Sequence, residues 1–282
     1  MSTFVHPIVV GYDGSADSDR ALDWAILVAG QRQCPIRLVA VIDEREDPDW
    51  LPDRVENARQ HALRQLGPDV EASLALPVTV TKPQKEPATH ALLRLASDAQ
   101  LIVLGARGHG ALGGFLIGSV SEHLARHAEC PVVVVRAPHD MGARRIVVGF
   151  DGSADSQLAV AFGFEMASAT KAPLTVVRCW GHVNPGGVGM YLPVRPAMTE
   201  KFDAEQQALR DDMREWCDKH PDVDVQLRTV PVPPVRVLTD ASAHAALVVV
   251  GSRGRDAFAG LLLGSVSQGV LHHAQSPVAI VR

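Results

Sequence analysis

The chain contains the same sequence pattern twice, and this repetition constrains its fold more than any other feature. Residues 8–18 (IVVGYDGSADS) return as residues 146–156 (IVVGFDGSADS), with Tyr12 and Phe150 as the single difference. A second pattern, G-x-x-G followed by nine residues and G-S-V-S, spans residues 105–121 and again 251–267. Such repetition indicates one folding unit written twice. The sequence therefore predicts two tandem domains, at residues 1–138 and 143–282.

Within each copy, short apolar segments alternate with helical patterns. In the first copy we expect strands at 8–10, 36–41, 78–80, 101–104 and 132–135, and helices at about 15–31, 53–66, 89–97 and 119–128. The first of these helices is expected to begin with Ser15 or Asp17 as its cap. Strands that alternate with helices are typical of a doubly wound parallel sheet. The predicted fold class is α/β, with a five-stranded parallel, Rossmann-like sheet in each domain.

The last strand of each copy is expected to lie at a sheet edge. These segments are Val132–Val135 and Val278–Val281, and both consist of apolar residues. An unpaired apolar edge attracts another strand. We therefore predict that the two last strands pair with each other across a pseudo-two-fold axis.

Composition excludes several function classes. The net charge is −5, which argues against binding driven by nucleic-acid phosphates. The four cysteines form no C-x-x-C motif, so they suggest neither a disulfide framework nor a zinc site. No apolar run is long enough to span a membrane and no signal peptide is recognised, so we expect a cytoplasmic protein.

Each G-x-x-G turn follows an apolar strand and precedes a helix start. Glycines allow the backbone to approach a ligand closely, and the N–H groups at a helix N-terminus attract phosphate. Ser119 with Glu122, and Ser265 with Gln268, fit the capping-box pattern. Ligands of doubly wound sheets bind at the carboxyl ends of the strands. The sequence therefore predicts a phosphate-binding turn in each copy.

This combination of an aspartate after the first strand with G-x2-G-x9-G-S-V-S after the fourth strongly resembles the universal stress protein family, over nearly the whole chain. The resemblance implies an adenine-nucleotide-binding fold that takes ATP, with Mg²⁺ as an expected companion and the metal ligands undetermined. The implied first site is Gly11, Asp13, Val41, Gly105, Arg107, Gly108, Gly118, Ser119, Val120 and Ser121. The implied second site is Gly149, Asp151, Cys179, Gly251, Arg253, Gly254, Gly264, Ser265, Val266 and Ser267.

Alternative interpretations of these residues remain. Asp13 and Asp151 either contact ligand or metal, which we favour, or cap the following helix. Arg107 and Arg253 contact phosphate or are solvated loop charges, with equal support. His123 and His127 are most simply solvated helix surface.

No P-loop lysine motif occurs, and neither a general base nor an activated nucleophile can be identified. We therefore expect a regulatory protein that binds ATP with little or no hydrolysis and acts on an unidentified protein partner. The alternatives are an ATP-consuming adenylyl or phosphoryl transferase and a structural dimerisation module with empty sites. Whether whole chains form a homodimer stays open.

Overall fold

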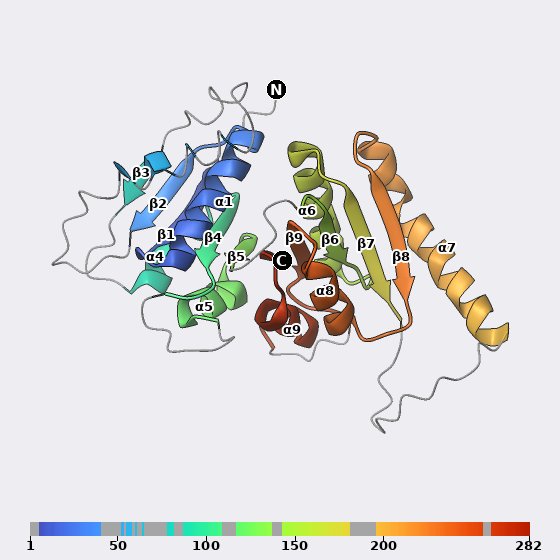
Figure 1. Cartoon of the computed structure of the whole chain (residues 1–282). Coiled ribbons are helices and arrows are strands. Elements are labelled where there is room, and N and C mark those ends of the chain that lie inside the picture. The colour runs from blue at the N-terminus through green and yellow to red at the C-terminus, as the bar shows by residue number, and fades with distance from the viewer. Residues whose placement is uncertain are drawn as a thin grey trace.

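The computed structural model describes residues 6–40, 78–81, 87–108, 117–136, 143–180, 196–255 and 261–282 (Figure 1). Between residues 41 and 77 it also describes residues 52, 53, 55–57, 60 and 64. The first half contains β1 (Ile8–Tyr12), α1 (Ala16–Arg32), β2 (Ile36–Ala40), β3 (Val78–Thr81), α4 (Ala88–Ala96), β4 (Leu101–Gly105), α5 (Ser119–His127) and β5 (Val132–Val135). The second half contains β6 (Ile146–Gly149), α6 (Ala154–Thr170), β7 (Leu174–Cys179), α7 (Pro196–Lys219), β8 (Val225–Val230), α8 (Pro234–Ser242), β9 (Leu247–Gly251), α9 (Ser265–His273) and β10 (Val278–Val281).

The described strands form one continuous ten-stranded sheet in the order β3-β2-β1-β4-β5-β10-β9-β6-β7-β8. Within each half every pairing is parallel, and β5 meets β10 in an antiparallel pair at the centre. Val133 lies opposite Ala279, and the flanking pairs are Val134 with Val278 and Val132 with Ile280. The α/β fold class and the pairing of the two last strands are confirmed.

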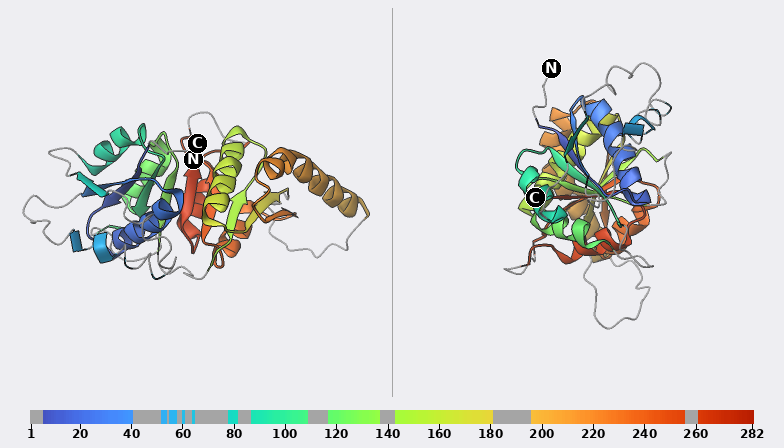
Figure 2. Two further views of the ribbon diagram at one scale, coloured as in Figure 1. Left: turned by 90° about the horizontal axis from the view of Figure 1, so that it is seen from above. Right: turned by 90° about the vertical axis from the view of Figure 1, so that its left-hand side faces the viewer.

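Helices cover both faces of the sheet and create two apolar cores (Figures 1 and 2). One core contains side chains of α1, α6 and α7, and the other contains side chains of α4, α5, α8 and α9. Each core includes residues from both halves of the chain, so the apolar packing is continuous across the β5–β10 pair. Among the described helices, none is both long and apolar enough to cross a bilayer.

The helix starts follow one prediction and correct another. Ser15 caps α1 and accepts a hydrogen bond from the Ser18 N–H, as expected. The capping boxes are wrong, because Gly118 and Gly264 are the N-caps of α5 and α9, and Ser119 and Ser265 are already helical. The reason is tertiary: the Gly118 N–H donates to the Ala106 carbonyl at 2.7 Å, which starts the helix one residue earlier.

Several sequence expectations fall outside the described residues. Val41, most of the loop between Gly108 and Gly118, and the linker at 137–142 are among them. Within the helix expected at 53–66, residues 53, 55–57, 60 and 64 are helical. The domain boundaries at 138 and 143 stay a prediction.

The central strand pair generates a stability prediction. Ala279 is fully buried at the middle of this pair, so Ala279→Asp places a carboxylate where no water can solvate it. We expect a loss of about 3 kcal/mol or more in the free energy of unfolding, measured by urea denaturation. Val232→Asp, at a side chain that is 36% exposed, is the matched control and should change the free energy little. Equal effects of the two substitutions would contradict a buried seam.

Candidate functional site

The carboxyl ends of β1 and β4 bring Asp13 beside the first glycine turn, residues 105–108. Asp13 Oδ1 accepts the Ser15 N–H at 3.0 Å, and the Ser15 hydroxyl donates to the Arg107 carbonyl at 3.2 Å. A Cβ at Gly108 would lie 2.3 Å from Asp13 Oδ2, so no other residue fits there without displacing the carboxylate. The aspartate and the turn therefore meet at the sheet edge where the sequence placed them.

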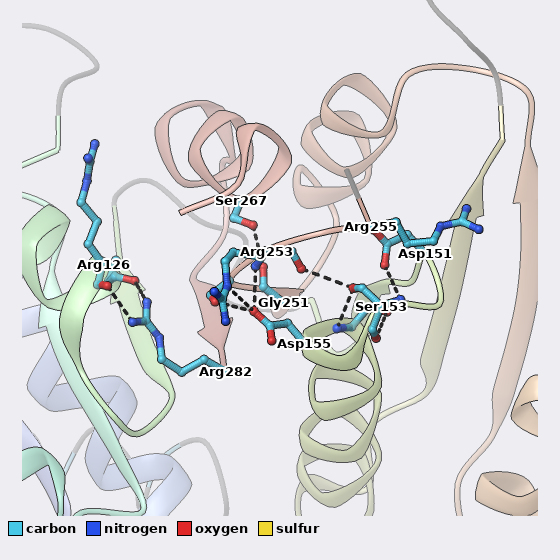
Figure 3. A network of polar contacts seen from close by, with 12 residues as sticks. Arg126, Asp151, Ser153, Asp155, Gly251, Arg253, Arg255, Ser267 and Arg282 are labelled. Atoms are coloured by element: carbon cyan, nitrogen blue, oxygen red, sulfur yellow. Dashed lines mark hydrogen bonds and ion pairs between the residues drawn. The ribbon is translucent and has the colours of Figure 1, made fainter. Parts of the chain in front are cut away.

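The second copy repeats this arrangement (Figure 3). Asp151 Oδ1 accepts the Ser153 N–H at 2.9 Å, and Asp151 Oδ2 accepts the Arg255 N–H at 3.1 Å. The Ser153 hydroxyl donates to the Arg253 carbonyl at 3.3 Å. A Cβ at Gly254 would lie 2.6 Å from Asp151 Oδ2. Both copies thus use an aspartate and a cap serine to hold the turn.

Hydrogen bonding determines the charge state of the second aspartate. Burial alone would raise the pKa of Asp151, but hydrogen bonds from Ser153 and from the backbone of Arg255 outweigh it and lower the pKa below its ordinary value. Asp151 is therefore a stabilised carboxylate and a weak base.

Four of the implied site glycines have packing reasons of their own. A Cβ at Gly105 would lie 2.6 Å from the backbone carbon of Asp17, and a Cβ at Gly251 would lie equally close to that of Asp155. The N-terminus of α1 or α6 therefore touches the turn directly. In β1 and β6, a Cβ at Gly11 or Gly149 would strike a leucine of the core, at 2.5 and 2.9 Å.

The turn arginines form ion pairs that the sequence analysis missed. Arg107 Nε lies 3.2 Å from Asp17 Oδ2, and Arg253 Nε lies 3.4 Å from Asp155 Oδ2. The aspartate side chains are only 6% and 14% exposed, whereas the arginines are 43% and 55% exposed. Asp155 Oδ2 also accepts the Ser252 hydroxyl at 2.7 Å. Each arginine thus fastens its turn to a helix and keeps part of its surface in solvent.

The N-termini of α5 and α9 face these turns. Their caps, Gly118 and Gly264, provide no side-chain acceptor for the first-turn N–H groups. Ser121 and Ser267 donate their hydroxyl hydrogens to the carbonyls of Gly105 and Gly251, at 2.6 and 2.5 Å, so they join helix to turn. Ser119 and Ser265 are exposed, and Val120 and Val266 are half-buried. Backbone N–H groups and the exposed hydroxyls of Ser119 and Ser265 are therefore donors that these helix ends can offer to an anion.

The resemblance implies an adenine contact at Val41 in the first copy and at Cys179 in the second, and only the second of these residues lies in the described part of the chain. Cys179 ends β7, and burial raises the pKa of its thiol to about 11, so it is neutral. The next residue, Trp180, has Lys201 Nζ at 5.0 Å from its ring centroid. An aromatic side chain and a lysine of α7 thus border this part of the second site.

Metal-binding chemistry is limited in the described part of the chain. No three His, Cys, Asp or Glu side chains gather there as a metal centre. The rings of His123 and His127 stack at 4.2 Å between centroids, and His127 Nδ1 lies 2.9 Å from the His123 carbonyl oxygen. These histidines therefore interact with each other and with their own helix.

Comparisons with known proteins agree with the two-domain α/β fold. The family model described as "Universal stress protein family" matches residues 5–136 and again 142–282. A universal stress protein of Mycobacterium tuberculosis is 35% identical over 98% of this chain and 97% of its own length. One of Mycolicibacterium smegmatis is 36% identical over 100% and 99%. The crystal structure of a universal stress protein from Archaeoglobus fulgidus, 16% identical, covers 99% of this chain and 97% of its own with a TM-score of 0.63, which shows a shared fold.

The lowered pKa of Asp151 generates a pH prediction. A carboxylate with a lowered folded-state pKa stabilises the fold above its unfolded pKa of about 3.9, and this contribution disappears as the pH falls through the folded pKa. The difference in unfolding free energy between wild type and Asp151→Asn should therefore be constant above about pH 5 and shrink at more acidic pH. Urea denaturation across this range measures it. A carbon-13 NMR titration that gives Asp151 a pKa at or above about 3.9 would contradict the assignment.

Proposed function

Because this chain belongs to the universal stress protein family, we propose that it is a cytoplasmic regulatory protein that binds ATP at two pseudo-symmetric sites. The observation that carries the proposal is the repeated pair of a glycine turn and a glycine-capped helix. In both copies the turn is held against the helix N-terminus by a serine hydroxyl. Family membership and this geometry support a phosphate-binding role for the same backbone.

The donors at each site suit a polyphosphate. The first-turn N–H groups of α5 and α9 lack a side-chain cap, and the helix dipole favours negative charge at this position. Arg107 and Arg253 are anchored by aspartates while remaining partly exposed, so each can add positive charge without a large ordering cost. The triphosphate would lie along the turn, with Gly108 or Gly254 allowing its close approach.

Magnesium would arrive with the nucleotide. Mg²⁺ in nucleotide sites is usually held by one or two carboxylates together with phosphate oxygens and water. The carboxylates of Asp13 and Asp151 lie against the second glycine of each turn, Gly108 and Gly254. This donor set fits a metal shared between protein and ATP, and the same carboxylates would orient the turn when the metal is absent.

The site supports binding better than turnover. A general base works best with a pKa near the operating pH, and hydrogen bonds lower the pKa of Asp151 instead. The alternative function, an adenylyl or phosphoryl transferase, requires a base or nucleophile at the phosphate end. We propose that ATP remains intact for long periods and that an unidentified protein partner distinguishes the occupied turns from the empty ones.

The first experiment is to denature the purified chain and count the nucleotide that it releases, by chromatography with mass detection. We expect close to two ATP per chain, or two after titration of the nucleotide-free protein with ATP and Mg²⁺. Mainly ADP or AMP, formed in step with added ATP, would favour the transferase. Failure of the refolded, Mg²⁺-supplied protein to bind any nucleotide would refute the proposal.

Substitution of the turn glycines tests each site separately. Gly108→Glu adds a side chain where Asp13 Oδ2 already lies 2.3 Å from the Cβ position, and it adds negative charge beside the phosphates. We expect Gly108→Glu and Gly254→Glu each to lower the stoichiometry by about one ATP per chain, as measured by calorimetry. Gln226→Glu adds the same charge on the exposed face of β8 and should leave the stoichiometry unchanged. Two bound ATP in Gly108→Glu would refute the first site.

A further inference from the structure

Two arginines cross from each half of the chain into the other. Arg136 follows β5, and both terminal nitrogens of its guanidinium donate to α9, to the carbonyls of Leu271 and, at 3.2 Å, His272. Arg282 follows β10 and donates in the same way to α5, to the carbonyls of Ala125 and, at 2.6 Å, Arg126 (Figure 3). The two contacts are equivalent under the pseudo-two-fold axis. We call Arg136 and Arg282 the crossing arginines.

Each crossing arginine donates hydrogen bonds to carbonyl groups in the last turn of a helix. The last carbonyls of a helix have no partner within the helix and carry its negative partial charge. A guanidinium that donates to two of them at once forms charge-assisted hydrogen bonds with a fixed geometry. A lysine could provide the charge but not the two-point contact. The crossing arginines therefore fix the positions of α5 and α9, in addition to balancing the negative partial charge at the C-termini of these helices.

The helices that they hold are those that line the two sites. The N-terminus of α5 faces the first glycine turn, and its C-terminus receives Arg282 of the other half. A helix of nine residues is only about 13 Å long, so a displacement at one end is transmitted to the other. By the same arrangement, α9 joins the second turn to Arg136.

Each crossing arginine is also connected to the glycine turn of its own half, through the strand residue that precedes it. The N–H of Ala106 donates to the carbonyl of Val135 at 2.7 Å, one residue before Arg136. The N–H of Ser252 donates to the carbonyl of Val281 at 2.6 Å, one residue before Arg282. The backbone that positions each crossing arginine is therefore bonded directly to a turn.

The charged residues at each turn also affect the pKa of the crossing arginine of the same half. Burial lowers the pKa of Arg282, while Asp155 raises it and Arg253 lowers it. Burial also lowers the pKa of Arg136, while Asp17 raises it and Arg107 lowers it. Each crossing arginine thus lies within electrostatic range of the ion pair that fastens its own turn.

We propose that Arg136 and Arg282 are positioning residues that couple the two ATP sites, because each joins the turn of one site to the helix that lines the other. This proposal rests on the proposed ATP-binding function. ATP at the first site fixes α5, and Arg282 passes that constraint to the turn of the second site. The second ATP then meets a turn that is already ordered, so binding at one site strengthens binding at the other.

The test measures a site in the half to which the mutated arginine does not belong. In Gly254→Glu only the first site remains for ATP, and Arg282 lies in the other half. Arg282→Gln in this background should weaken ATP binding at the first site by about fivefold, measured by calorimetry with Mg²⁺, because the helix loses two charge-assisted hydrogen bonds. In the chain with both sites intact, Arg282→Gln should also abolish the tighter binding of the second ATP, which a loss of support for α5 alone would not change. Arg136→Gln in Gly108→Glu should weaken the second site similarly. Arg282→Lys should restore only part of the affinity.

Arg32→Gln is the matched control. Arg32 also crosses between the halves, to Glu165 and Met166 of α6 at 3.5 Å. It lies at the C-terminal end of α1, whereas the N-terminal end of α1 touches the glycine turn. Arg32→Gln should leave both affinities unchanged, and melting temperatures will show that each variant is folded. If Arg282→Gln leaves the first site unchanged or acts no more strongly than Arg32→Gln, the coupling is refuted while ATP binding stands. If the wild type binds no ATP, the proposed function fails and the coupling fails with it.

Discussion

The antiparallel pairing of β5 with β10 is the interaction on which the rest of the structure depends. It turns two five-stranded sheets into one and lets each apolar core continue from one half into the other. It also places the strands that support the two glycine turns side by side, since β5 and β10 each accept a hydrogen bond from the turn of their own half. The geometry of both candidate sites is therefore tied to one seam of backbone hydrogen bonds.

Much of this architecture could be predicted because its signals are local or repeated. Apolar strand segments, the cap at Ser15 and the position of Asp13 after β1 follow from short stretches of sequence. The seam itself followed from a general rule, that an apolar edge strand needs a partner. The boundaries of β1 were harder: the strand continues to Tyr12, whose hydroxyl donates to Asp19 at 2.5 Å.

The errors and omissions concern contacts between distant segments. The pattern from Ser119 to Glu122 fits a capping box in isolation, but a hydrogen bond to Ala106 makes Gly118 the cap. The pairing of Arg107 with Asp17 depends on how α1 meets the turn after β4, which no periodicity reveals. A signal was nevertheless present. Asp17 and Asp155, like Arg136 and Arg282, occupy matching positions in the two copies, and repetition could have identified them as candidates.

The seam also has a consequence for how the two copies can diverge. A strand that pairs with its own counterpart would allow either copy to associate with itself as separate chains. Joining the copies covalently gives the unlike pair an effective concentration on the order of millimolar, so pairing within one chain prevails. Differences such as Ala106 against Ser252 can then persist in one copy without appearing in the other. A covalent joint thus converts a symmetric association into a molecule whose two halves can be adjusted independently.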